Sequence, residues 1–218
     1  MRLTSLEFAS HLAYVPRSGG GSLGAQSRDL MHALKQGTQT GTPPRPFSWQ
    51  VVNLIKQRDM TGQAFSGFLG AEKVLVPVPK SSLHREGSLW IPDDLANALV
   101  EAGLGARVAH LLERTEAIPK AATSMSSQRP TAQRHYETMR VQKDLLPTNE
   151  ILLVDDVITT GAAMLGSANR LMESYPSCSI RGFAAMRTIS QPLLFKSWSD
   201  PVTGSITLES SGWCTRYP

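Results

Sequence analysis

From residue 71 onward, short apolar runs alternate with segments of helical periodicity. Two helices are predicted there, one opening at Asp93-Asp94 with Leu95 and Leu99 on one face, and one over residues 162–175. The run at residues 151–154 is continuously apolar, as in a parallel strand buried on both faces. Four runs are predicted to be strands: residues 74–78, 107–112, 151–154 and 180–186. This alternation predicts an α/β fold with a central, mostly parallel sheet flanked by helices.

The flanking segments have a different pattern. Residues 1–70 are predicted to form a small helical region, with a flexible Gly/Ser stretch at 18–22 and a helix-breaking proline cluster at 43–46. Ser27 is a candidate cap for one short helix, and a second helix is predicted near Ser48 with Val51, Val52 and Ile55 facing inward. Residues 191–218 have weak periodicity and receive no assignment. The predicted segments are therefore 1–70, a core at 71–190, and a tail at 191–218.

Composition is that of an ordinary globular protein. The 218 residues are 41% hydrophobic and 18% charged, and they contain no apolar run long enough to span a membrane. The N-terminus lacks the apolar stretch of a signal peptide. Cys178 and Cys214 have no companion ligands at metal-binding spacing, so both are expected to be free thiols in a reducing cytoplasm.

The net charge of +4 is concentrated in one stretch, residues 120–143. That stretch holds a single acid, Glu137, and five basic residues: Lys120, Arg129, Arg134, Arg140 and Lys143. A local basic segment favours a small anionic ligand over a long polyanion. Aromatic residues are few and do not alternate with the basic ones, which counts against nucleic-acid binding by base stacking.

The most informative segment is residues 151–164, where an apolar strand ends in Asp155 and Asp156. A short loop containing Thr159, Thr160 and Gly161 follows and opens the next helix. Free N–H groups at such a helix start can bind a phosphate, while carboxylates beside it suit sugar hydroxyls or Mg²⁺. The segment therefore predicts a site for a sugar phosphate. The alternative is a pair of solvated acids that only cap the helix.

Residues 154–161, Val-Asp-Asp-Val-Ile-Thr-Thr-Gly, resemble the phosphoribosyl-pyrophosphate (PRPP) motif of type I phosphoribosyltransferases. Over residues 71–190, including Val76-Pro-Val-Pro79, the chain is similar to the ComF-like branch, which is close to the amidophosphoribosyltransferases. The resemblance implies that Asp155 and Asp156 bind the ribose hydroxyls and Mg²⁺. It also implies a PRPP-binding stretch that continues through Val157, Ile158, Thr159, Thr160, Gly161, Ala162 and Ala163.

Three features depart from the family pattern. Ala163 stands where the family usually has Thr, residues 85–88 replace a characteristic Arg-Gly-Phe-Asn stretch, and the frequent N-terminal cysteine cluster is absent. The resemblance further implies that Pro79, Lys80 and Ser81 belong to a pyrophosphate loop.

Residues 120–143 occupy the place of the family's mobile loop over the diphosphate. Within it, Arg129, Arg134 and His135 are candidates to contact the leaving group. The alternative for these side chains, and for Lys80 and Arg85, is incidental surface charge.

The implied activity is transfer of a phosphoribosyl group from PRPP to a nucleobase or related nitrogen acceptor, with release of pyrophosphate and Mg²⁺ as the cofactor. In this family the acceptor is chosen by a hood of variable flanking segments, which here are residues 1–70 and 191–218. Two alternatives stay open. One is a PRPP-binding regulator or competence factor without transferase activity, and the other is a nucleic-acid accessory protein that uses the basic segment. A homodimer is a further expectation.

Overall fold

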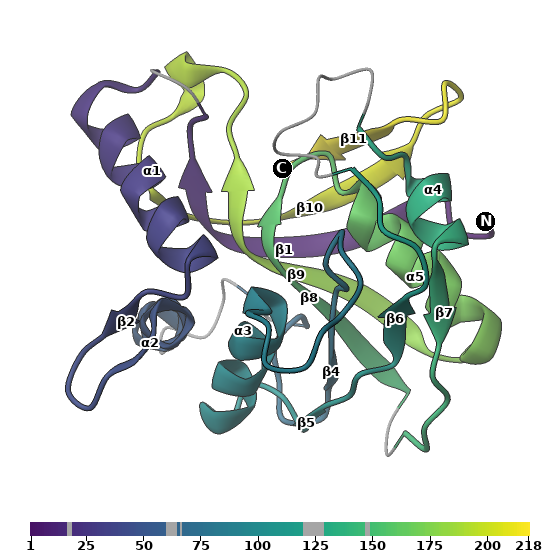
Figure 1. Cartoon of the computed structure of the whole chain (residues 1–218). Coiled ribbons are helices and arrows are strands. Elements are labelled where there is room, and N and C mark those ends of the chain that lie inside the picture. Colours follow the sequence, from purple (N-terminus) through teal and green to yellow (C-terminus); the bar gives the residue numbers. More distant parts are fainter. Residues whose placement is uncertain (17–18, 60–64, 66, 120–128, 147–148) are drawn as a thin grey trace.

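The computed structural model of the chain has a single large twisted sheet at its centre (Figure 1). The structure describes all residues except 17–18, 60–64, 66, 120–128 and 147–148. The sheet has seven strands in the order β11-β10-β1-β9-β8-β4-β5. From β1 to β5 all neighbouring strands are parallel, whereas β10 and β11 are added by antiparallel pairing. The predicted α/β class with a mostly parallel sheet is confirmed.

The strands of the large sheet are β1 (Ser5–Tyr14), β4 (Val74–Pro77), β5 (Arg107–Val108), β8 (Glu150–Ile158), β9 (Ser179–Thr188), β10 (Ser199–Leu208) and β11 (Cys214–Tyr217). Two small ribbons are formed by β2 (Gln39–Thr40) with β3 (Arg45–Pro46), and by β6 (Leu112–Arg114) with β7 (Met139–Val141). The helices are α1 (Gly21–Lys35), α2 (Phe47–Asp59), α3 (Ile91–Glu101), α4 (Ala132–Glu137) and α5 (Ala162–Ser174), and a 3₁₀ turn spans Pro192–Leu194.

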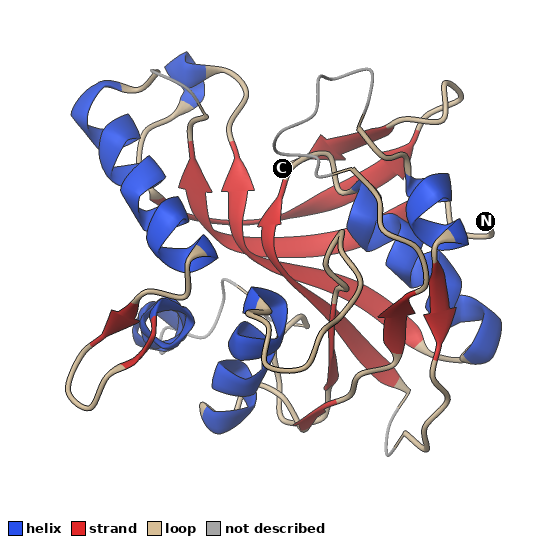
Figure 2. Ribbon diagram, in the orientation of Figure 1, coloured by secondary structure: helices blue, strands red, loops and turns tan. Residues whose placement is uncertain are grey.

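Two hydrophobic cores lie on opposite faces of this sheet, which is why its central strands are apolar on both sides. In β8, Ile151 and Leu153 pack with α5, while Leu152 and Val154 pack with residues of α1, α2 and α3. Helices therefore cover both faces, as Figure 2 shows in blue around the red sheet. Within the described residues, no helix combines the length and apolar character needed to cross a bilayer.

Most elements predicted in the core are present with shifted ends. The predicted strand 151–154 continues through the acids to Ile158, and the predicted helix over 162–175 is α5. The helix predicted at Asp93 begins two residues earlier, at Ile91, because Pro92 is accommodated in its first turn. Near Ser48, α2 buries Val51, Val52 and Ile55 as predicted, and both cysteines are free.

Several predictions were wrong. Ser27 does not cap a helix, because α1 already begins at Gly21 after a left-handed Gly20. The Ser27 hydroxyl instead donates to Gly24 O (2.7 Å) within the helix. The predicted strand 107–112 is divided between β5 and β6, because the chain turns where the Leu111 N–H donates to Ala109 O.

The described part of the basic segment, residues 129–143, contains a helix and a strand. Residues 120–128 lie outside the described residues, but α4 and β7 follow within the same segment. Ala132 and Met139 are fully buried and anchor these two elements. The polar composition of this segment therefore gave no indication that two of its apolar residues are buried in the core.

The central sheet draws on all three predicted segments. β1, which the sequence pattern missed, comes from residues 1–70, and β10 and β11 come from the unassigned tail. The C-terminus consequently lies near the carboxyl end of β8 in Figure 1. This arrangement brings the tail to the predicted site.

Candidate functional site

The acid pair lies near the carboxyl end of β8, between β9 and β4 in the sheet. The two carboxylates accept backbone hydrogen bonds from their own strand: Asp156 N donates to Asp155 Oδ1 (2.9 Å), and Val157 N donates to Asp156 Oδ1 (2.7 Å). Burial, and then the neighbouring Asp156 charge, raise the pKa of the Asp155 carboxyl to about 8. The two acids therefore do not share the site as two equal negative charges at neutral pH.

A lysine from the N-terminal region completes this cluster. Lys35, the last residue of α1, donates from Nζ to Asp156 Oδ2 at 2.9 Å. Burial lowers the pKa of Lys35, but the charge and hydrogen bond of Asp156, together with Asp155 and Tyr14, raise it, and the pKa lies above its usual value. Burial raises the pKa of the nearby Tyr14 phenol, against the opposing charges of Lys35 and Arg129. The acid pair thus has a built-in counter-ion and a phenol beside it.

The loop after β8 has the geometry of an anion-binding helix start. Gly161 is the N-cap of the 13-residue helix α5, with φ of 87° and no side-chain cap hydrogen bond. The first N–H groups of α5 therefore have no side-chain acceptor from the N-cap. Thr159 and Thr160 lie in the same short loop, three to five residues from the acids. The predicted phosphate-binding residues and the predicted sugar-binding acids are thus brought together by one strand–loop–helix unit.

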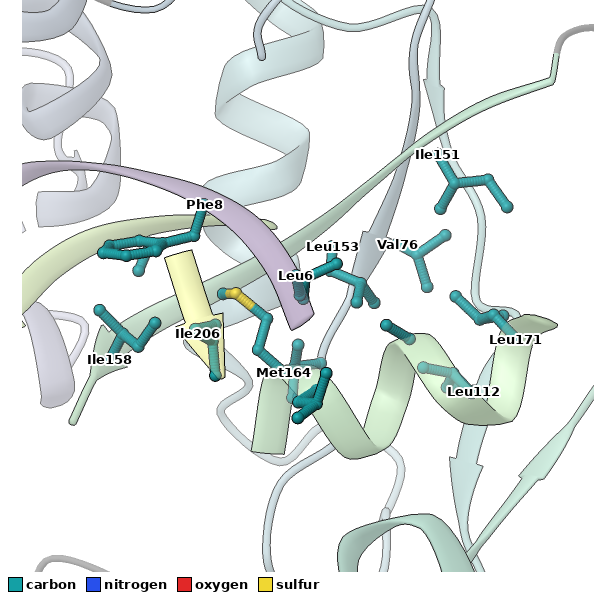
Figure 3. Packing of buried hydrophobic residues seen from close by; sticks show 14 of the residues in the cluster. Leu6, Phe8, Val76, Leu112, Ile151, Leu153, Ile158, Met164, Leu171 and Ile206 are labelled. Carbon is teal, nitrogen blue, oxygen red and sulfur yellow. The ribbon is translucent and has the colours of Figure 1, made fainter. Parts of the chain in front are cut away.

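The loop also packs tightly against the C-terminal strands. A Cβ at Gly161 would lie only 2.5 Å from Ile206 Cγ1 of β10. Figure 3 shows Ile206 grouped with Phe8, Ile158 and Met164 at this end of the core. Gly161 is therefore required both for its left-handed backbone and for this close approach.

Arg216 of the C-terminal strand β11 also contacts this loop. Its Nε donates to Thr159 O (2.8 Å) and its Nη2 donates to Thr188 O (2.6 Å). Burial, and then the charge of Arg187, lower the pKa of Arg216 to about 10. Sequence reasoning missed this residue because it lies in the unassigned tail.

The predicted pyrophosphate loop lies beside the acids. It follows β4, the neighbour of β8, and the Val78 N–H donates to Val154 O at 2.8 Å. The Lys80 ammonium donates to Ser88 Oγ (2.6 Å) and Leu89 O (3.0 Å), and burial lowers the pKa of Lys80. The turn is thus in the predicted place, with its lysine held by the following turn.

A buried arginine that was not predicted from the sequence donates a hydrogen bond to this turn. Arg114, 3% exposed, donates to Lys80 O (3.0 Å) and to Thr138 Oγ1 (2.7 Å), and lies 3.3 Å from His135 Nδ1. Burial, and then the charge of Arg114, lower the pKa of His135 to about 3. His135 is therefore a neutral, buried partner of Arg114, and the prediction that it reaches a leaving diphosphate was wrong. No apolar run marks Arg114, because its strand β6 (Leu112–Arg114) contains two charged residues.

The two arginines predicted to contact the diphosphate are placed differently. Arg129 lies close enough to Tyr14 for its charge to act on the phenol, and its buried Nε has no partner among the described residues. Arg134 is exposed and paired with Glu116. The structure thus brings Arg129 toward the acid side of the site and leaves Arg134 in a surface ion pair.

The donor set fits a metal ion only in part. The described residues contain no group of three or more His, Cys, Asp or Glu side chains suited to a metal ion. Asp155 and Asp156 are two carboxylates, and Lys35 already binds one of them. Mg²⁺ is commonly held by one or two carboxylates together with substrate phosphates. Asp155 and Asp156 alone could thus supply two of the ligands of a Mg²⁺ ion, and the remaining ligands would have to come from elsewhere.

Neither a protein-family model nor a curated protein matches the chain. Among solved structures, it is similar to a hypoxanthine phosphoribosyltransferase from Staphylococcus aureus, with 14% identity over 75% of this chain and 82% of that chain, at a TM-score of 0.33. It is also similar to the hypoxanthine phosphoribosyltransferase of Trypanosoma cruzi, with 12% identity over 76% of each chain and a TM-score of 0.31. Both TM-scores lie below 0.5, so the function of this chain has to be argued from its own residues.

Proposed function

We propose that this chain is a phosphoribosyltransferase that uses PRPP and Mg²⁺ to transfer the phosphoribosyl group to a nitrogen acceptor, such as a nucleobase, with release of pyrophosphate. One observation carries the proposal. A single strand–loop–helix unit, from β8 into α5, holds two carboxylates suited to sugar hydroxyls next to a helix start suited to a phosphate. The likeness of residues 154–161 to the PRPP motif supports the same substrate.

In this proposal the protein acts mainly by holding the ribose in position. Asp155 and Asp156 accept hydrogen bonds from the 2′- and 3′-hydroxyls, and the loop through Gly161 binds the 5-phosphate. The nitrogen lone pair of the acceptor forms a bond to ribose C1 while the C1–O bond to pyrophosphate breaks, and the N–H proton of the acceptor passes to water or to the departing pyrophosphate. Such a dissociative step gains most from positioning and from stabilising the departing charge. No covalent nucleophile from the protein is required.

The departing diphosphate needs cations. The turn at Pro79–Ser81 lies beside the acids and offers backbone N–H groups, and Arg129 supplies positive charge on the Tyr14 side. Mg²⁺ bound to the diphosphate would neutralise its charge, with Asp155 and Asp156 as the protein carboxylates available to it. Arg134 would contact the diphosphate only after its ion pair with Glu116 breaks.

A second candidate function is PRPP binding without transfer. Two side chains predicted to contact the diphosphate are already bound to other residues, which favours this candidate. Lys80 donates hydrogen bonds to Ser88 and Leu89, and Arg134 forms an ion pair with Glu116. Ala163, in place of the family's Thr, also removes one hydroxyl. The engagement of Lys80 and Arg134 would weaken stabilisation of the departing diphosphate, and therefore catalysis, whereas the missing hydroxyl at Ala163 would weaken recognition of the 5-phosphate.

Calorimetric titration of PRPP with Mg²⁺ tests both candidates. Wild type should bind in the micromolar range, and the double variant Asp155→Asn, Asp156→Asn should lose binding while keeping its circular dichroism spectrum. The matched control is Asp29→Asn with Glu137→Gln, which makes the same acid-to-amide change at two exposed positions. Absence of binding by folded wild type would refute both candidates.

A second measurement separates transfer from binding alone. Pyrophosphate release would be followed with a panel of nucleobases and simple amines. Release with one acceptor supports the transferase, whereas PRPP binding without release under any acceptor supports the binding protein.

A further inference from the structure

The C-terminal strands bring a cation to the phosphate-binding loop. In the antiparallel register of β10 and β11, Ile206 is paired with Arg216, so both side chains are on the same face of the sheet. Ile206 is the residue that closely approaches Gly161. Arg216 reaches the same loop directly through its hydrogen bond to Thr159 O (2.8 Å). β10 and β11 therefore each contact the loop at one point.

Positive charge exceeds negative charge at this place. Arg216 lies beside Arg187, whose side chain is 5% exposed and pairs with Asp200. Among the described residues, no carboxylate forms an ion pair with Arg216. The Nε of Arg187 is buried and has no hydrogen-bond partner in the described part of the chain. Arg187 thus has one carboxylate partner and Arg216 has none among the described residues, and such a surplus of positive charge at partly or fully buried positions is costly unless an anion is bound.

The guanidinium also has donors to spare. An arginine carries five N–H donors, and the hydrogen bonds to Thr159 O and Thr188 O account for two of them. The guanidinium carbon lies 5.6 Å from the centre of the Phe8 ring, which fixes its plane from one side. Arg216 is therefore held in place by carbonyls and an aromatic ring, and its charge remains available.

We infer that Arg216 is a positioning residue for a phosphate monoester at the β8–α5 loop: it holds the Thr159 carbonyl and supplies the counter-charge for the phosphate. The inference rests on the proposed function and identifies the part of the chain that completes its phosphate site. It also accounts for Ala163, because a charged donor from β11 compensates for the hydroxyl that Ala163 lacks.

The test compares two ligands that occupy different halves of the site. Ribose 5-phosphate carries the monoester that Arg216 is expected to serve, whereas inorganic pyrophosphate with Mg²⁺ is expected at the Pro79–Ser81 turn. Calorimetry would measure both affinities in wild type, Arg216→Gln and Arg216→Lys. The matched control is Arg140→Gln, an exposed arginine paired with Glu113 on the small β6–β7 ribbon.

Arg216→Gln is expected to weaken ribose 5-phosphate binding more than tenfold and to leave pyrophosphate binding unchanged. Arg216→Lys keeps the charge but lacks the paired donors, so a two- to fivefold loss is expected. Equal loss of both ligands would mean a merely structural role and would overturn the inference. If Arg216→Gln does not fold, an Arg216→Lys affinity equal to that of wild type would overturn it as well.

The outcome also distinguishes this inference from the proposed function. Wild type that binds neither ribose 5-phosphate nor PRPP refutes the proposed function itself. Wild type that binds both, with Arg216→Gln binding equally well, refutes only the role of Arg216.

Discussion

Replacing Gly161 by alanine should destabilise the protein through two separable effects. The first is backbone strain, because φ at Gly161 is 87° and a left-handed residue with a Cβ costs about 1–2 kcal/mol. The second is overpacking, because the new Cβ would lie 2.5 Å from Ile206 Cγ1, and forcing extra atoms into a packed core costs about 1–3 kcal/mol. The expected loss in free energy of unfolding is therefore about 2–5 kcal/mol.

Gly103→Ala is the matched control for the backbone effect. Gly103 also has a positive φ, of 77°, but no atom lies within 4 Å of the position its Cβ would take. Urea unfolding followed by circular dichroism would give the free energy of unfolding for wild type and both variants. Gly103→Ala should cost about 1–2 kcal/mol, so the excess cost of Gly161→Ala measures the contact with Ile206.

A double variant tests directly whether the side chain of Ile206 causes the overpacking at Gly161. Ile206→Ala removes the atoms that a Cβ at Gly161 would meet, so the combined loss in Gly161→Ala, Ile206→Ala should be smaller than the sum of the single losses. Equal losses for Gly161→Ala and Gly103→Ala, or strict additivity in the double variant, would show that β10 does not pack against the loop as described.

Three other perturbations test the charges around the site. Burial and Asp156 raise the folded-state pKa of Asp155 to about 8, so the unfolded chain releases this proton at a lower pH than the folded chain does. The free energy of unfolding should therefore fall between about pH 4 and pH 8. In unfolding measured as a function of pH, Asp155→Asn should flatten that fall. Arg114→Met should lower the free energy of unfolding by about 3 kcal/mol or more, because buried carbonyl and hydroxyl acceptors lose their hydrogen-bond donor. In the same urea unfolding assay, Arg140→Met at an exposed position should change it by less than about 0.5 kcal/mol. Lys35→Met removes the counter-ion of Asp156 and should raise the affinity for Mn²⁺ at least tenfold by calorimetry, and unchanged affinity would contradict the role of Lys35 as a counter-ion.

The local parts of the site could be predicted from the sequence because one short segment contains them. Residues 151–164 carry the apolar strand, the acids, the loop and the helix start, and the structure places them as β8, its following loop and α5. A continuous apolar run with a glycine before a helical pattern is enough to fix this arrangement. The end of the strand was misjudged, because Asp155, Val157 and Ile158 continue the pairing with β9.

The surrounding charges could not be predicted in the same way. Lys35 meets Asp156 across 121 positions of sequence, and Arg216 meets Thr159 across 57. Both contacts depend on the strand order, in which β1 joins β9 and β10 is then added by antiparallel pairing. A strand such as β1, with polar residues among its buried positions, gives no apolar run to recognise.

If the proposed function holds, the same strand order decides which segments can influence the reaction. β1 and α1 bring Tyr14 and Lys35 to the acid pair, while β10 and β11 bring Ile206 and Arg216 to the phosphate loop. The acids and the loop are thus contacted from opposite directions by the two ends of the chain. A ribose 5-phosphate held between them would have its hydroxyls next to N-terminal residues and its phosphate next to C-terminal ones. Substitutions in α1 should therefore alter sugar and acceptor binding, whereas substitutions in β11 should alter phosphate binding.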